Sequence, residues 1–120
     1  MTEINGSVIT EVVKKLCIDA NYYINDDVRN AIKEGIEKET TPLAKEVLEK
    51  INLNSEIARN ENVPICQDTG MAVVFMEIGQ DVHIIGNVEQ AVNEGVRQGY
   101  AEGYLRKSVV ADPLRRVYCP

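Results

Sequence analysis

Apolar residues recur every three to four positions along most of the first half of the chain, which is the spacing of amphipathic helices. Over residues 3–23 they predict one helix with a single apolar face. Asn25 is a suitable N-cap for a second helix, and Thr41-Pro42 marks the start of a third. We expect Asn52-Leu53-Asn54 to interrupt this third helix and a short helix to follow over residues 55–60.

The helical pattern ends at Pro64, because proline pushes the residue before it towards extended geometry. The loop VPICQDTG over residues 63–70 places a cysteine, an amide, a carboxylate and a hydroxyl in a row. An almost wholly apolar run over residues 72–78 predicts an internal strand. Val82-His83-Ile84-Ile85 predicts a second, short strand and is a candidate hairpin partner for the first.

The last strong periodic segment begins at Asn87, which resembles the cap of a capping box with Gln90, and predicts a long helix. Gly95, Gly99 and Gly103 recur on one face of this helix. Each glycine costs about 1 kcal/mol of helix propensity against alanine. Their common spacing therefore indicates the close approach of another backbone, whether in this chain or in another.

Together these elements predict an α+β fold that is mainly helical. It comprises three to four N-terminal helices, a short two-stranded β element and one further long helix. The length of 120 residues is that of one domain. The basic tail ends on Cys119-Pro120 without a finishing element, so we expect residues 1–120 to be a single partial domain, a fragment of a larger one.

The composition excludes several classes of protein. A net charge of −6 argues against general affinity for nucleic acid or for an anionic membrane. There is no apolar run long enough to span a membrane, and the N-terminus lacks the basic and apolar regions of a secretory signal. Three widely spaced cysteines form a poor disulfide framework, which favours the reducing cytoplasm.

Cys66 is the cysteine that lies in the polar loop, and its residue type is compatible with three roles: attack, metal ligation or packing. As a nucleophile it needs a base, and the sole histidine, His83, is better explained as an ordinary strand residue. As a metal ligand it needs other thiolates. Cys17 lies on an apolar helical face, where packing explains it, and Cys119 lies in the unfinished tail.

Two charged residues are further candidates on chemical grounds. Asp68 could move a proton, although an aspartate in a loop more often bonds its own backbone. Arg106 could clamp a carboxylate through its two-pronged guanidinium, although an arginine after a helix is more often solvated. Residue types alone therefore indicate a helical domain with a polar, chemically capable loop.

Three longer motifs give the chain a family resemblance: PICQDTG, NEGVRQGYAEGYLRKSVV and ADPLRR. Together they resemble the N-terminal part of class I, iron–sulfur-dependent fumarate hydratase, and equally the alpha subunit of L-tartrate dehydratase. The resemblance spans nearly the whole chain. PICQDTG is quite specific, and GYLRKSVV at the right distance from it makes a chance match improbable.

The resemblance implies a role for each matching residue. Cys66 would be one of three cysteine ligands of a 4Fe-4S cluster whose fourth iron is open to substrate. Gln67 and Asp68 would contact the substrate, Asp68 would also take part in proton transfer, and Arg106 would bind a substrate carboxylate. The reaction would be the reversible hydration of fumarate to malate, a step of the tricarboxylic acid cycle, or the dehydration of tartrate.

The chain departs from the family after ADPLRR. The family continues with an Asn-Thr-Gly-Asp-Asn-type run and a second half that carries the other two cluster cysteines, so no ligand role passes to Cys119. The resemblance thus implies one cluster ligand here and no catalysis by the chain alone. Its expected partners are a C4 dicarboxylate, the remainder of the alpha chain, and a beta subunit or C-terminal domain in a homo- or hetero-oligomer. The competing hypotheses are a tartrate dehydratase segment and a non-catalytic helical assembly module.

Overall fold

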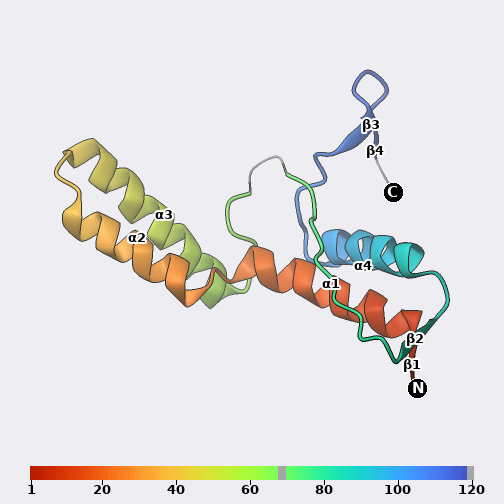
Figure 1. Cartoon of the computed structure of the whole chain (residues 1–120). Coiled ribbons are helices and arrows are strands. Elements are labelled where there is room, and N and C mark those ends of the chain that lie inside the picture. The colour runs from red at the N-terminus through yellow and green to blue at the C-terminus, as the bar shows by residue number, and fades with distance from the viewer. Residues whose placement is uncertain (68–69, 119–120) are drawn as a thin grey trace. The chain divides into compact units, whose positions relative to one another are not determined.

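The computed structural model describes residues 1–67 and 70–118 (Figure 1) and confirms the mainly helical α+β class. The chain divides into two compact units, one formed by residues 1–18 with 68–120 and the other by residues 19–67. No helix in the described ranges combines the length and apolar character of a membrane-spanning segment. The elements in chain order are β1 (Thr2–Asn5), α1 (Gly6–Tyr22), α2 (Asp26–Lys38), α3 (Pro42–Glu61), β2 (Val82–Ile85), α4 (Val88–Glu102), β3 (Val110–Asp112) and β4 (Val117–Tyr118).

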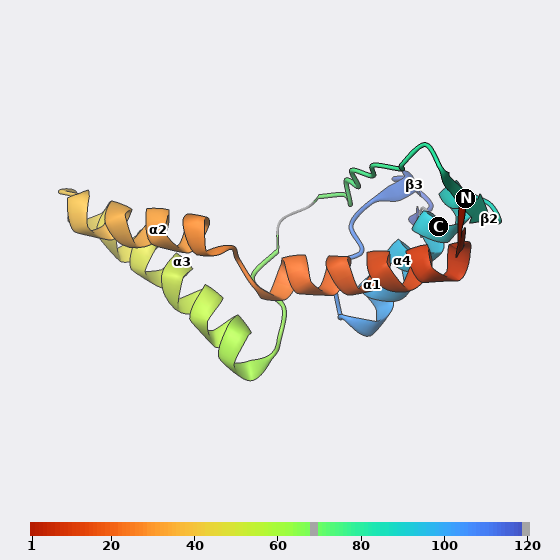
Figure 2. The ribbon, with the colours of Figure 1, turned by 60° about the horizontal axis from the view of Figure 1, so that its bottom comes forward.

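In the first unit, α4 runs alongside the part of α1 that belongs to the same unit (Figures 1 and 2). A Cβ atom on Gly95 would lie 2.7 Å from both the carbonyl oxygen of Thr10 and the Cβ of Val13. A Cβ on Gly99 would lie 3.0 Å from the carbonyl oxygen of Lys14. Only glycine permits such an approach between helices. The backbone that the glycine spacing predicted is therefore α1 of this same chain.

Polar contacts accompany this close packing of α1 and α4. The hydroxyl of Thr10 donates to the carbonyl oxygen of Ala91 at 2.9 Å, and the Lys14 ammonium lies 3.5 Å from the carboxylate of Glu102. At the start of α4 the Asn87 side chain accepts a hydrogen bond from the Gln90 backbone amide at 2.9 Å. The predicted cap of the last helix is thus confirmed.

The predicted apolar face of the first helix is only partly buried. Val13 is buried against α4. The neighbouring stripe of Val8, Val12 and Leu16 stays more than half exposed. Periodicity identifies an apolar face correctly, but it does not show how much of that face finds a partner.

The first residues of the chain form a strand, where the sequence predicted helix from residue 3. β1 pairs in parallel with β2, so that Thr2 lies opposite Val82 and Asn5 opposite Ile85. The Asn5 side chain accepts a hydrogen bond from the backbone amide of Ser7 at 2.9 Å. This bond satisfies one of the free amides at the start of a helix, which explains why α1 begins at Gly6.

The predicted internal strand over residues 72–78 is absent, and with it the predicted hairpin with β2. This segment contains no strand residues and is drawn as coil in Figure 2. Val73 and Phe75 are 69% and 93% exposed. An apolar run of this kind needs a hydrogen-bonding neighbour to become a strand, and within the described residues β2 pairs with β1 instead.

In the second unit, α2 and α3 form a helical hairpin (Figure 1). The predicted interruption at residues 52–54 is wrong, because α3 is continuous. The Asn52 side chain donates to Glu56 at 3.1 Å, and the Ser55 hydroxyl donates to the carbonyl oxygen of Asn52 at 2.7 Å. The Asn52 amide group and the Ser55 hydroxyl thus find hydrogen-bond acceptors within α3, so these polar residues do not end the helix. α3 ends at Glu61, and the residue that caps it, Asn62, has a left-handed backbone (φ 55°), which is a common helix terminator.

The tail also gains structure that the sequence did not predict. β3 and β4 pair in antiparallel fashion. The carboxylate of Asp112 accepts hydrogen bonds from the backbone amides of Leu114 and Arg115 at 2.8 and 3.0 Å. An aspartate that bonds the backbone two and three residues on is a typical turn former, so residues 113–116 of the ADPLRR motif form the turn of a short hairpin.

Candidate functional site

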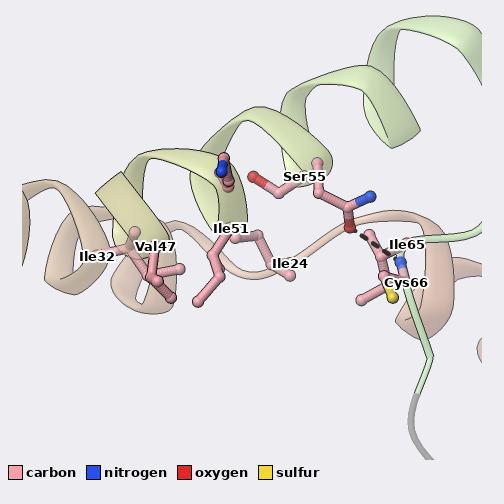
Figure 3. A pocket seen from close by; sticks show the side chains of 9 residues that line it. Ile24, Ile32, Val47, Ile51, Ser55, Ile65 and Cys66 are labelled. Carbon is pink, nitrogen blue, oxygen red and sulfur yellow. Dashed lines mark hydrogen bonds between the residues drawn. The ribbon is translucent and has the colours of Figure 1, made fainter. Parts of the chain in front are cut away.

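The backbone of Cys66 is held by hydrogen bonds within the second unit. The Cys66 amide donates to the side-chain oxygen of Asn54 at 2.9 Å, as the dashed line in Figure 3 shows. The preceding residue, Ile65, donates its amide to the carbonyl oxygen of Asn21 at 2.8 Å. A side chain of α3 and a carbonyl group of α1 therefore hold the backbone of Ile65 and Cys66, while the Cys66 side chain stays exposed.

Cys66 lies at one end of a pocket of about 470 Å³, shown in Figure 3. The walls are mostly aliphatic, and among the described residues that line the pocket Lys50 carries the charge. A dicarboxylate requires cations and hydrogen-bond donors when it loses its water. This pocket is therefore poorly suited to hold one by itself. Its described lining comprises Ile24, Ile32, Val47, Lys50, Ile51, Asn54, Ser55, Ile65 and Cys66.

The two described cysteines have different environments, and only one suits a metal ligand. Burial raises the pKa of the Cys17 thiol, and a Cβ on Gly99 would lie 2.9 Å from the Cys17 Cβ, so this residue packs against α4. Cys66 is exposed and can present a thiolate to a metal or cluster. In the described ranges, no three side chains of histidine, cysteine, aspartate or glutamate gather as a metal site. Among the described residues, Cys66 is thus the side chain whose exposure and chemistry fit a cluster ligand.

This difference predicts unequal alkylation of the two thiols. Because the thiolate is the reacting form, the raised pKa and partial burial of Cys17 should slow its reaction at mildly alkaline pH. We expect Cys66 to react with iodoacetamide roughly ten times faster than Cys17. Peptide mapping by mass spectrometry over a time course measures both rates. The two rates should converge in urea, and equal rates in the folded chain would contradict the packing of Cys17 against α4.

A second pocket, of about 710 Å³, lies within the first unit. One side comes from α4, through residues that include Asn93, Arg97 and Tyr100, and another from Arg106, Lys107 and Ser108, which follow α4. Apolar residues 71, 72 and 74 and three apolar residues of α4 complete much of the lining. Cations and hydrogen-bonding groups beside apolar walls are what a small carboxylic acid requires of a binding site.

Arg97 is already engaged by a carboxylate. Its guanidinium donates to both oxygens of Glu94, at 2.6 and 2.7 Å, and Gln98 adds a third bond to Glu94. Hydrogen bonds from Arg97 and Gln98 lower the pKa of Glu94 to about 2. Glu94 therefore stays ionised, and neutralises Arg97, throughout the physiological range. Arg106 and Lys107 are the other two cationic side chains among the described residues that line the pocket.

The structure places the predicted site residues in different parts of the chain. Cys66 and Gln67 belong to the second unit, where Gln67 is partly buried. Arg106 is exposed and lines the pocket of the first unit. Asp68 and Cys119 lie outside the described residues.

His83 is an exposed residue of β2 opposite Glu3. The predicted hairpin between residues 72–78 and β2 is not formed. The structure thus supports the interpretation of His83 as an ordinary strand residue.

Sequence reasoning missed several residues that the structure brings to these sites. Asn54 was interpreted as part of a helix break, yet its side chain holds the Cys66 loop. Asn93 and Tyr100 line the Arg106 pocket with Lys107 and Ser108. The spacing of seven between Asn93 and Tyr100 places both on one helical face, which is the one signal that could have linked them in advance.

Comparison with known proteins gives a consistent result. A family model described as "Fumarate hydratase (Fumerase)" matches residues 10–118. The chain is 38% identical over 110 residues to a putative L(+)-tartrate dehydratase subunit alpha of Methanocaldococcus jannaschii, a match that covers 90% of this chain and 38% of that protein. It is 26% identical over 102 residues to the L(+)-tartrate dehydratase subunit alpha of Escherichia coli K12, covering 85% and 34%. The chain spans little more than a third of the length of these relatives.

Proposed function

This chain belongs to the fumarate hydratase family, whose model matches residues 10–118, and we propose that it is part of a hydro-lyase that adds water to or removes water from a C4 dicarboxylate. The observation that carries the proposal is the pocket at which Arg106 and Lys107 lie beside hydrogen-bonding side chains and apolar walls. Guanidinium groups bind carboxylates in two-pronged fashion. Arg106 would orient the substrate by one carboxylate, which lowers the entropic cost of the reaction.

Cys66 would supply one of the three cysteine ligands of a 4Fe-4S cluster. Its exposed thiol and its amide bond to Asn54 support this role, because a ligand held by its backbone needs little reorganisation. When bound, such a cluster would act as a Lewis acid on the hydroxyl leaving group. Gln67 would contact the substrate. Asp68 would take part in proton transfer, accepting a proton as the carboxylate or donating one as the carboxylic acid.

The substrate is either fumarate, hydrated reversibly to malate, or L-tartrate, from which water is lost. The family description supports the first reaction, and the names of the two relatives support the second. Those names, which specify an alpha subunit, also support a beta subunit as a partner. We propose that the chain works in such an assembly and is inactive by itself, since it offers one described cysteine suited to cluster ligation.

The competing proposal is a non-catalytic helical module kept for assembly. The exposed apolar stripe on α1 is the observation that favours it, since such stripes often mark contact surfaces. The two proposals differ in what they expect of the candidate site residues. An assembly module would tolerate substitution of Cys66 and Arg106, whereas a hydro-lyase would not.

The proposal is tested by anaerobic assay of the chain, first alone and then assembled with a beta subunit and the remaining alpha-chain sequence of its family. We expect no turnover from the chain alone after incubation with iron and sulfide. The assembled protein should convert fumarate or L-tartrate, and the ratio of the two kcat/KM values identifies the substrate. Absence of turnover with both substrates in a cluster-loaded assembly would exclude this function.

A further inference from the structure

Ser108 lines the same pocket as Arg106 and carries a polar atom that the fold leaves unsatisfied. Its hydroxyl oxygen is buried and has no hydrogen-bond partner in the part of the chain that the structure describes. An unsatisfied buried hydroxyl destabilises a folded protein, and native structures contain few of them. A ligand that completes the hydrogen bonding is one reason for such a residue to be retained.

The surroundings of Ser108 indicate what this ligand would be. Ser108 follows Arg106 by two residues and Lys107 by one, and all three line the pocket. Arg97, on the α4 side, is neutralised by Glu94. Two cationic side chains in the same pocket favour an anionic ligand, and the Ser108 hydroxyl can donate a hydrogen bond to it. A carboxylate suits this role, because it can accept further hydrogen bonds beyond the two that it accepts from a guanidinium group.

We propose that Ser108 is a substrate-binding residue whose hydroxyl donates a hydrogen bond to the carboxylate that Arg106 holds. This inference rests on the proposed function of Arg106. Without ligand the hydroxyl is buried within the pocket wall, while the residue as a whole is only partly buried. Rotation about a single side-chain bond moves a serine hydroxyl between its staggered positions, and this rotation delivers the donor to the bound carboxylate.

Ser55 provides a matched comparison. Ser55 is a buried residue whose hydroxyl, unlike that of Ser108, has a partner: it donates to the carbonyl oxygen of Asn52 at 2.7 Å. Ser55→Ala breaks a satisfied bond and should lower stability. Ser108→Ala removes an unsatisfied group and should leave the ligand-free chain at least as stable. Replacing a serine with a purely structural role by alanine would lower the stability of the protein. Replacing a serine that binds the ligand would lower the affinity for the ligand instead.

The test is titration of the 15N-labelled chain with succinate, a C4 dicarboxylate without a hydroxyl, followed by NMR at the pocket resonances. Ser108→Ala should weaken succinate binding about tenfold, the typical effect of losing a hydrogen bond to a charged group. Ser108→Thr, which keeps the hydroxyl, should bind nearly as wild type does. Ser55→Ala should bind as wild type does. Urea unfolding of the same proteins provides the stability comparison.

The outcomes separate this inference from the proposed function. If Arg106→Gln weakens succinate binding and Ser108→Ala does not, the role of Ser108 is wrong and that of Arg106 stands. If the wild-type pocket does not respond to succinate, or Arg106→Gln binds it unchanged, the carboxylate site itself is wrong and the inference is lost with it. A marked loss of stability in Ser108→Ala would also overturn the inference.

Discussion

Gly95→Ala is expected to destabilise the first unit by about 1–3 kcal/mol, the usual range for an overpacked core. The new methyl group would lie 2.7 Å from the carbonyl oxygen of Thr10 and from the Cβ of Val13. Neither atom belongs to the flexible end of a side chain, so α4 must move away from α1. Alanine also gains about 1 kcal/mol of helix propensity, but the clash involves a backbone oxygen and a Cβ atom, so we expect the overpacking cost to be the larger of the two effects. Urea unfolding followed by circular dichroism measures the change.

Gly35→Ala is the matched control, since Gly35 is also a glycine inside a helix. A Cβ there would lie 3.5 Å from the Cδ1 atom of Leu48, an ordinary van der Waals contact. This variant should therefore be stabilised by up to about 1 kcal/mol through helix propensity. If both alanine variants were equally stabilised, the close contact of α1 and α4 would be refuted.

The glycine face illustrates what sequence can and cannot predict. The spacing of Gly95, Gly99 and Gly103 predicted a close backbone contact, because three glycines in one helix carry a cost that packing must offset. The partner, α1, lies about eighty positions earlier in the chain. Nothing local in either helix identifies the other, so only the fold could supply that information.

The β elements show the opposite limit. Residues 72–78 have the composition of an internal strand, but composition does not provide a pairing partner. β2 was predicted correctly as a strand and incorrectly as a hairpin partner, because its neighbour comes from the first residues of the chain. Strand pairing depends on contacts distant in sequence, and periodicity does not reveal them.

Part of the candidate site was accessible from motifs alone. PICQDTG and GYLRKSVV are sufficient to single out Cys66 and Arg106 as candidates. Asn54 and Ser108 were not predicted as site residues. Asn54 matters because its side chain accepts a hydrogen bond from the Cys66 amide, and Ser108 because its buried hydroxyl oxygen has no hydrogen-bond partner among the described residues. Both properties depend on which groups the folded chain places around them, and residue type gives no indication of either.

Cys66→Ala is expected to have the largest effect on function. A cluster that loses one of three thiolate ligands is held far less tightly, so iron content and turnover should fall to near background. The Cys66 side chain is exposed, so the substitution should leave the stability of the chain almost unchanged. Loss of function would then reflect loss of a ligand and not loss of the fold.

Cys17→Ala is the matched control for this substitution. Cys17 is partly buried where α1 packs on α4, and burial raises its thiol pKa. Its replacement should lower the free energy of unfolding modestly while iron content and turnover remain near wild type. Comparison of the two variants thus distinguishes a cluster ligand from a packing residue in one experiment.

The most direct test of the proposed cluster site is the iron content of the assembled, anaerobically prepared enzyme, measured for wild type, Cys66→Ala and Cys17→Ala together with turnover. We predict that Cys66→Ala loses both the cluster iron and the activity, and that Cys17→Ala keeps both. A Cys66→Ala enzyme with wild-type iron content and turnover would contradict the ligand role of Cys66.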